Sequence, residues 1–203
     1  MKAILLGKEH DITGFASDDP SRYILQSVHY RPQDKLIEAT NGRVLVRVPV
    51  IESEEFPPVK GQTEDPPVEA TIPVAPFQKA LKNIPKTNLA ILEHFKLESN
   101  GSITFRTTDL DVEQAVVCRP IEGQYPKTDQ VWPEQKDYPV VFALAGIQLK
   151  KVVEYACKHG LTDDCTIKFS VKDELTPVLF SIAIKSNGEP AEAKGVLMPM
   201  RLT

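Results

Sequence analysis

The chain has 203 residues, of which 41% are hydrophobic and 26% charged, a composition typical of a globular protein with one large or two small domains. Its net charge of −4 argues against binding nucleic acid through overall positive charge, but leaves room for lysines gathered on one surface. The apolar run Ala3–Leu6 is too short for a signal peptide or a membrane span. Three cysteines, Cys118, Cys157 and Cys165, without C-x-x-C spacing indicate neither a disulfide framework nor a zinc site. We therefore expect a cytoplasmic protein.

Short apolar stretches separated by turn residues predict a fold built mainly from strands. Seventeen prolines and ten glycines punctuate the chain, and Asn-Gly pairs at 41–42, 100–101 and 187–188 are typical of tight hairpins. The expected strands are Lys35–Ala39, Arg43–Val48, Ala90–Glu98, Ser102–Thr107, Gln114–Arg119, Thr166–Lys172, Val178–Lys185 and Gly195–Met200.

Two segments have the apolar spacing of amphipathic helices. In Pro76–Ile84 the apolar residues recur at helical spacing, and Pro85 ends the pattern. In Gly146–His159 a similar stripe is followed by Gly160, a common stop signal. Each helix follows a short apolar strand and precedes several further strands, which predicts a repeated β-α-β-β-β unit. We thus expect an α+β fold of antiparallel sheets with few helices.

Two stretches lie outside this repeat. Ser21–Val50 supplies strands without an obvious helix, so we expect a third unit that has lost its first strand and helix. Ile51–Pro67 contains many acidic residues and four prolines, a composition that predicts an exposed loop.

Several segments resemble the bacterial DNA polymerase III β sliding clamp family. Val196–Leu202, in the sequence V-L-M-P-M-R-L, is similar to the family's terminal V-M-P-M-R-L. Ala39–Leu45 resembles the family's A-T-D-G-H-R-L segment, with Asn41 for aspartate and Arg43 for histidine. Ile121–Pro126, followed by V-W-P, resembles its G-x-F/Y-P…V-x-P segment, and the R-Y-I-L stretch at 22–25 its R-Y-x-L strand.

In that family these segments form one apolar groove, which receives short Gln-, Leu- and Phe-containing motifs of replication and repair proteins. The resemblance implies a non-enzymatic protein, without cofactor or metal, that binds such motifs. Methionines and prolines suit a preformed apolar pocket, and Arg43 at its rim either favours acidic peptides or partly closes the pocket. The implied groove residues are Leu25, Thr40, Gly42, Arg43, Leu45, Pro126, Val131, Val196, Met198, Pro199, Met200, Arg201 and Leu202.

The resemblance does not cover a whole clamp. Residues 1–133 are similar to the middle domain without its first helix, and residues 134–203 to half of the last domain. The resemblance implies a homo-oligomer, with double-stranded DNA bound without sequence specificity inside a ring of four or more copies. The alternative is a stand-alone peptide-binding module that does not encircle DNA.

Lysines on the two expected helices are candidates to face DNA phosphates. They are Lys79, Lys82, Lys86, Lys150, Lys151 and Lys158. The alternative is an ordinary solvated face, with Glu154 pairing to Lys150 or Lys158 at helical spacing.

Enzymatic alternatives find less support. Asp109 and Asp111 have the spacing to recruit a divalent ion, but a turn into the next strand explains them as well. Cys157 or Cys165 with His159 suggests a nucleophile and base, yet no orienting third group follows from the sequence.

Overall fold

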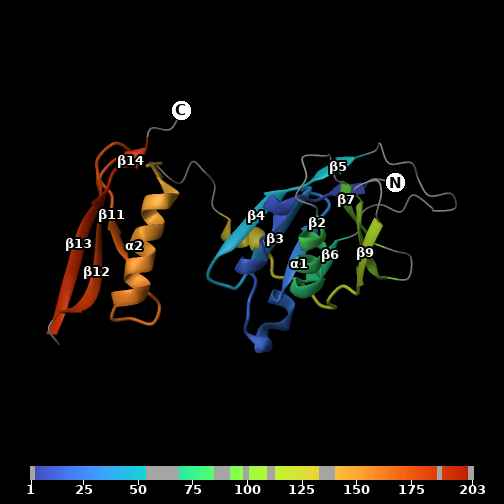
Figure 1. Cartoon of the computed structure of the whole chain (residues 1–203), viewed down its shortest axis with the longest axis horizontal. Helices are drawn as coiled ribbons and strands as arrows, with labels where there is room; N and C mark the ends of the chain where they lie inside the picture. Colours follow the sequence, from blue (N-terminus) through green and yellow to red (C-terminus); the bar gives the residue numbers. More distant parts are fainter. Residues whose placement is uncertain are drawn as a thin grey trace. The chain divides into compact units, whose positions relative to one another are not determined.

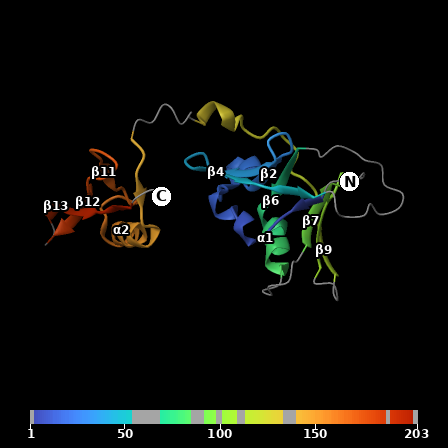
Figure 2. The same cartoon turned by 90° about the horizontal axis from the view of Figure 1, so that it is seen from above.

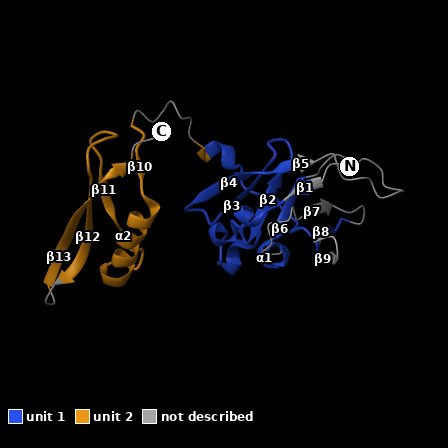
Figure 3. Ribbon diagram, turned by 45° about the horizontal axis from the view of Figure 1, so that its top comes forward, with its two compact units in different colours: residues 1–130 blue, residues 131–203 orange. Residues whose placement is uncertain are grey.

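The computed structural model describes residues 3–53, 69–84, 92–97, 101–108, 113–132, 140–186 and 189–200. The chain divides into two compact units, residues 1–130 (unit 1) and residues 131–203 (unit 2), which are treated separately (Figure 3). The sequence suggests a boundary between residues 133 and 134, close to this division.

Unit 1 is built around two antiparallel sheets. Its strands are β1 (Ala3–Leu5), β2 (Ser27–Arg31), β3 (Leu36–Thr40), β4 (Leu45–Pro49), β5 (Ile51–Ser53), β6 (Ala70–Pro73), β7 (Leu92–Leu97), β8 (Ile103–Thr108) and β9 (Glu113–Cys118). One sheet has the order β5-β1-β7-β8-β9 and the other β4-β3-β2-β6. All the described strand pairs of unit 1 are antiparallel.

Unit 1 contains two similar halves that exchange a strand. The first half runs from β1 through three 3-10 helices, η1 (Lys8–His10), η2 (Thr13–Phe15) and η3 (Pro20–Leu25), to β2, β3, β4 and β5. The second half runs from β6 through helix α1 (Val74–Asn83) to β7, β8 and β9. The opening strand of each half lies in the sheet of the other, because β1 pairs with β7 and β6 pairs with β2.

Two sequence predictions for the first half of unit 1 are wrong. The first half has its opening strand, because Ala3–Leu5 pairs with β5 on one edge and with β7 on the other. The loop predicted for Ile51–Pro67 begins with a strand, since Ile51–Ser53 forms β5. Both strands have only three residues and depend on distant partners, so no local alternation of apolar residues marks them. Residues 54–67 lie outside the described part of the chain.

Helix α1 closes the core of unit 1. The predicted stripe is correct, since Phe77, Ala80 and Leu81 are buried, and the helix lies beside β6 and β9 (Figures 1 and 2). Phe77 meets Phe105 of β8 edge to face, with ring centroids 5.8 Å apart. Residues of both halves share this core, so neither half has a separate interior.

Unit 2 contains one such β-α-β-β-β arrangement. Its elements are β10 (Ala143–Leu144), α2 (Gly146–His159), β11 (Lys168–Ser170), β12 (Val178–Ser186), β13 (Glu189–Leu197) and β14 (Pro199–Met200). They form the sheet β11-β12-β13 and the pair β10-β14. Val152 and Ala156 of α2 pack on Val178 and Ile182 of β12, so the helix lies along one face of the sheet (Figures 1 and 2).

The predicted elements of unit 2 differ from the observed ones mainly at their ends. Helix α2 has the predicted bounds. The predicted strand Gly195–Met200 is instead two strands, because β13 starts at Glu189 and ends at Leu197, and β14 follows after Met198. Within the described residues, no helix is both long and apolar enough to cross a membrane.

Candidate partner-binding surface

The hairpin between β3 and β4 carries four of the predicted groove residues. Gly42 has a φ of +88°, a conformation that a side chain would strain. Its N–H donates to Thr40 Oγ1 at 3.0 Å, and the Thr40 hydroxyl donates to the Val44 carbonyl at 2.6 Å. Asn41 Oδ1 accepts from the backbone N–H groups of Arg43 and Val44. Side chains therefore hold the turn in one shape.

Helix η3 and the segment around Gly123 lie next to this hairpin. Arg22 Nη1 donates to the Asn41 carbonyl at 3.2 Å, which ties η3 to the turn. Gly123 has a φ of +143°, and a side chain there would approach Ile24 to 3.1 Å. The absence of a side chain at Gly123 therefore allows residues 121–126 to pass close to η3.

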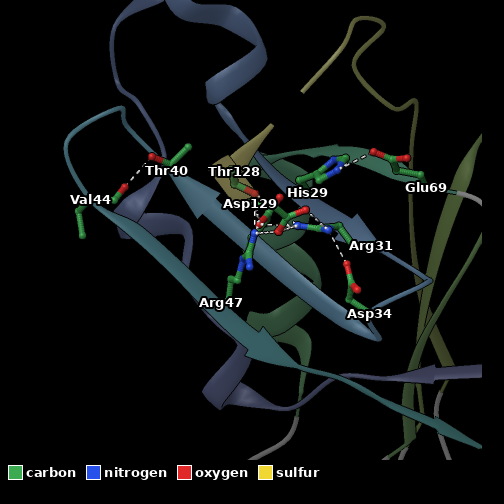
Figure 4. A network of polar contacts seen from close by, with 10 residues as sticks. His29, Arg31, Asp34, Thr40, Val44, Arg47, Glu69, Thr128 and Asp129 are labelled. Atoms are coloured by element: carbon green, nitrogen blue, oxygen red, sulfur yellow. Dashed lines mark hydrogen bonds and ion pairs between the residues drawn. The ribbon is translucent and has the colours of Figure 1, made fainter. Parts of the chain in front are cut away.

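A buried carboxylate links β3, β4 and η4 (Thr128–Val131). Glu38 is 1% exposed, and its Oε2 accepts from Arg47 Nε at 2.9 Å and from the Thr128 hydroxyl at 2.7 Å (Figure 4). Asp129 receives both terminal nitrogens of Arg31, at 2.8 and 2.7 Å, and Arg47 Nη2 at 2.6 Å. These arginines lower the pKa of Asp129, and Asp129 in turn raises the pKa of Arg31.

An aromatic stack holds the segment before η4. The ring of Tyr125 lies parallel to that of His29 on β2, with centroids 4.3 Å apart. His29 Nε2 contacts Glu69 Oε1 at 2.8 Å, and its Nδ1 lies 3.3 Å from the Thr71 hydroxyl (Figure 4). Burial lowers the pKa of His29 and, together with Glu38, raises the pKa of Tyr125. The two stacked rings are therefore neutral at pH 7.

These contacts frame a pocket of about 890 Å³ in unit 1. Tyr125 and Pro126 line one part of it, and Arg31, Asp34 and Gln33 line another. The pocket combines an apolar segment with charged groups already engaged in ion pairs. Of the predicted groove residues, Pro126 contributes to this hollow.

The remaining described groove residues belong to unit 2, and all of them except Pro199 are exposed. Val131 is 71% exposed, Val196 56%, Met198 67% and Met200 54%. Pro199 is half-buried and pairs with Leu144 of β10. Arg201 and Leu202 lie outside the described residues.

Unit 1 thus brings six predicted residues onto three neighbouring segments, namely η3, the β3–β4 hairpin and residues 123–126. Leu25 and Thr40 are each 8% exposed, so they support the surface from beneath. Three exposed large apolar side chains beside predicted positions, Tyr23, Val44 and Trp132, are not among the predicted groove residues. Their positions within the matched motifs, next to predicted groove residues, are the sequence signal that points to them.

Five of the six predicted lysines lie on the described helices. Lys79 and Lys82 are exposed on α1, and Lys150, Lys151 and Lys158 on α2. Lys150 contacts Glu154 at 3.7 Å, the helical pairing expected of a solvated face. Lys86 lies outside the described residues.

The enzymatic alternatives gain no geometric support. Asp109 and Asp111 fall outside the described residues, among which no group of three His, Cys, Asp or Glu side chains is placed to hold a metal. The ring of His159 packs on Tyr155 at 4.8 Å, and Cys157 on the same helix is exposed. Hydrogen bonding to Cys157 raises the pKa of Cys165, which disfavours the thiolate needed of a nucleophile.

The two strand-exchanging halves of unit 1, the β-α-β-β-β arrangement of unit 2 and the α-helix packed on each unit define a DNA-clamp-like fold. Among solved structures, the chain is similar to a proposed DNA polymerase III beta subunit from Eubacterium rectale, with a TM-score of 0.63 and 16% sequence identity. The match covers 98% of this chain and 51% of that chain, so the present chain spans about half the length of its structural neighbour. Neither the family models nor the curated proteins gave a match.

Proposed function

We propose that this clamp-like protein is a non-enzymatic recruitment factor that binds short linear motifs of replication or repair proteins. The observation that carries the proposal is the preformed turn at Asn41–Val44, which side-chain hydrogen bonds of Thr40 hold in shape and Arg22 ties to η3. A rigid surface binds a flexible peptide with less loss of conformational entropy than a mobile one.

The chemistry of the candidate residues favours an apolar peptide anchor. Met198 and Met200 have unbranched, polarizable side chains that adapt to leucyl and aromatic groups. Within unit 1, considered by itself, Tyr23 and Val44 are exposed apolar side chains, and Tyr125 and Pro126 line a hollow. Arg22 and Arg43 give that surface positive charge, which favours motifs with acidic residues.

Peptide binding is tested with a fluorescently labelled clamp-binding peptide that carries Gln, Leu and Phe. We expect micromolar binding by fluorescence anisotropy, and a loss of at least tenfold in affinity for Met200→Asp because a charge replaces an apolar contact. Val117→Asp is the matched control, since Val117 is an equally exposed apolar residue, 62%, on β9 of unit 1. Absence of binding to the wild-type chain, or equal affinity of Met200→Asp, would contradict the proposal.

A second candidate function is non-specific DNA binding by an oligomeric ring. It is favoured by five exposed lysines on α1 and α2, the only two α-helices among the described residues. Retention on closed circular DNA, with release after linearisation, distinguishes a ring from a stand-alone peptide-binding module.

A further inference from the structure

Unit 2 has the strand order of the first half of unit 1. In unit 1, β1 is followed by helical turns and then by β2, β3 and β4, and β5 returns to pair with β1. In unit 2, β10 is followed by α2 and then by β11, β12 and β13, and β14 returns to pair with β10. The connections match as well, since Val50 separates β4 from β5 and Met198 separates β13 from β14.

The two arrangements differ at two strand edges. In unit 1 the second edge of β1 pairs with β7, and the outer edge of β2 pairs with β6, both supplied by the other half. Among the described residues, β10 pairs only with β14 and β11 only with β12. Unit 2 therefore presents two strand edges at the positions where unit 1 exchanges strands (Figure 3).

Burial differs in the same way. The first four residues of β2 are buried, whereas all three residues of β11 are exposed. Phe169 on β11 is 41% exposed, and Val140 and Val141, which precede β10, are 41% and 42% exposed. Among the described residues, the core of unit 2 has five buried apolar residues, namely Val152, Ala156, Val178, Ile182 and Leu197. A core of this size stabilises a small unit poorly by itself.

We propose that unit 2 is completed by unit 2 of a second copy of this chain, each copy adding its β10 antiparallel to the outer edge of the other copy's β11. This exchange creates two sheets, each with β14 and β10 from one copy followed by β11, β12 and β13 from the other. Their order reproduces the sheet β5-β1-β7-β8-β9 of unit 1. The inference gives a structural basis to self-association but does not depend on peptide binding.

A second copy fits these edges better than an unrelated partner for two reasons. The donor strand and the acceptor edge lie on the same unit, so a two-fold axis satisfies both edges at once. The exchange also requires no new type of contact, because unit 1 makes both pairings within one chain. Phe169 and Val141 would then be covered, as the equivalent parts of β2 and β6 are in unit 1.

The mass of the full chain in solution tests the pairing directly. We expect light scattering at micromolar concentration to give twice the chain mass of 22.6 kDa. The double variant Val141→Glu/Phe169→Glu places like charges across the proposed contact and is expected to be monomeric. Leu175→Glu is the matched control, because Leu175 is 66% exposed in the loop between β11 and β12 and the equivalent loop of unit 1 is solvated.

Hydrogen exchange supplies a readout that needs no variant. Peptides covering 140–145 and 167–171 are expected to gain protection together as the protein concentration rises, while those covering α1 do not change. A monomer at all concentrations, a dimer that survives the double variant, or protection at neither segment would overturn the proposal. Each of these results leaves peptide binding to be judged by its own assay.

Discussion

At the scale of single residues, the distinctive feature of unit 1 is a carboxylate that is almost fully buried. Glu38 is tolerated there because Arg47, Thr128 and Arg31 surround it, the closest of them at 2.7 Å. A buried charge without such partners would cost several kcal/mol, and removing one partner of a buried ion pair costs about 3–5 kcal/mol. The network therefore fixes Thr128 and Asp129 against β3 and β4. The candidate surface is thus anchored from below by ionic contacts.

The buried imidazole of His29 predicts a pH dependence of stability. Burial lowers its pKa in the folded state below the ordinary 6.5, so the unfolded state binds the proton more readily. Stability is then fully present above pH 6.5 and decreases as the pH falls below it, by at most about 1.4 kcal/mol per pH unit for one proton. Urea unfolding of unit 1, followed by NMR between pH 5 and 8, should show this slope, and His29→Gln should reduce it.

The titration of His29 itself is the direct check. The NMR titration of its imidazole signals should have a midpoint below pH 6.5, and the ring stacked on Tyr125 should be neutral at pH 7. A midpoint above 6.5 would show that Glu69 and Glu38 outweigh burial, and the slope would then have the opposite sign.

At the scale of elements, the β3–β4 hairpin carries a prediction about Gly42. An added Cβ would sit 2.9 Å from Arg22 Nη1 and require a left-handed backbone, so Gly42→Ala should destabilise unit 1 by about 1–2 kcal/mol. Because Arg22 would be displaced from the Asn41 carbonyl, peptide affinity should also weaken.

Gly14→Ala is the matched control for the hairpin variant. Gly14 has open space around it and no left-handed φ, so its replacement should change neither the free energy of unfolding of unit 1 nor the peptide affinity. Equal effects of the two substitutions on urea unfolding would show that the left-handed backbone at Gly42 does not determine the stability of the hairpin.

Local patterns predicted the elements that bury a continuous apolar face. Helix α2 was predicted at its observed bounds because its stripe repeats over fourteen residues, and the Asn41-Gly42 turn because glycine suits positive φ. Strands β1 and β5 were missed since three residues carry no detectable period. The Glu38 network was missed for another reason: Arg31 and Asp129 are 98 positions apart, and no local pattern links them. The candidate surface was chosen through a family resemblance, which indicated segments but not the exposed Tyr23 and Val44 beside them.

At the scale of the whole molecule, the proposed pairing would give a dimer. Its two copies of unit 2 would form one shared domain, and each chain would keep its own unit 1. Each unit 1 is already complete, since its two halves share one core. A larger ring would therefore need contacts through unit 1 as well. The helix of each unit carries exposed candidate lysines, so DNA binding can be measured without assuming a copy number.

Charge reversal on the helices decides whether these lysines bind DNA. If Lys79, Lys82, Lys150 and Lys151 each neutralise a phosphate, replacing all four with Glu should reduce the slope of log affinity against log salt by about 3–4, since each contact contributes about 0.9. Affinity for closed circular duplex at low salt should fall steeply in the same variant. Lys172→Glu/Lys185→Glu is the control, because both lysines are exposed in unit 2 but lie outside α2. A wild-type chain without salt-dependent retention, or a fourfold variant with an unchanged slope, would contradict DNA binding through these lysines. The stand-alone peptide-binding module would then be the remaining proposal for the function.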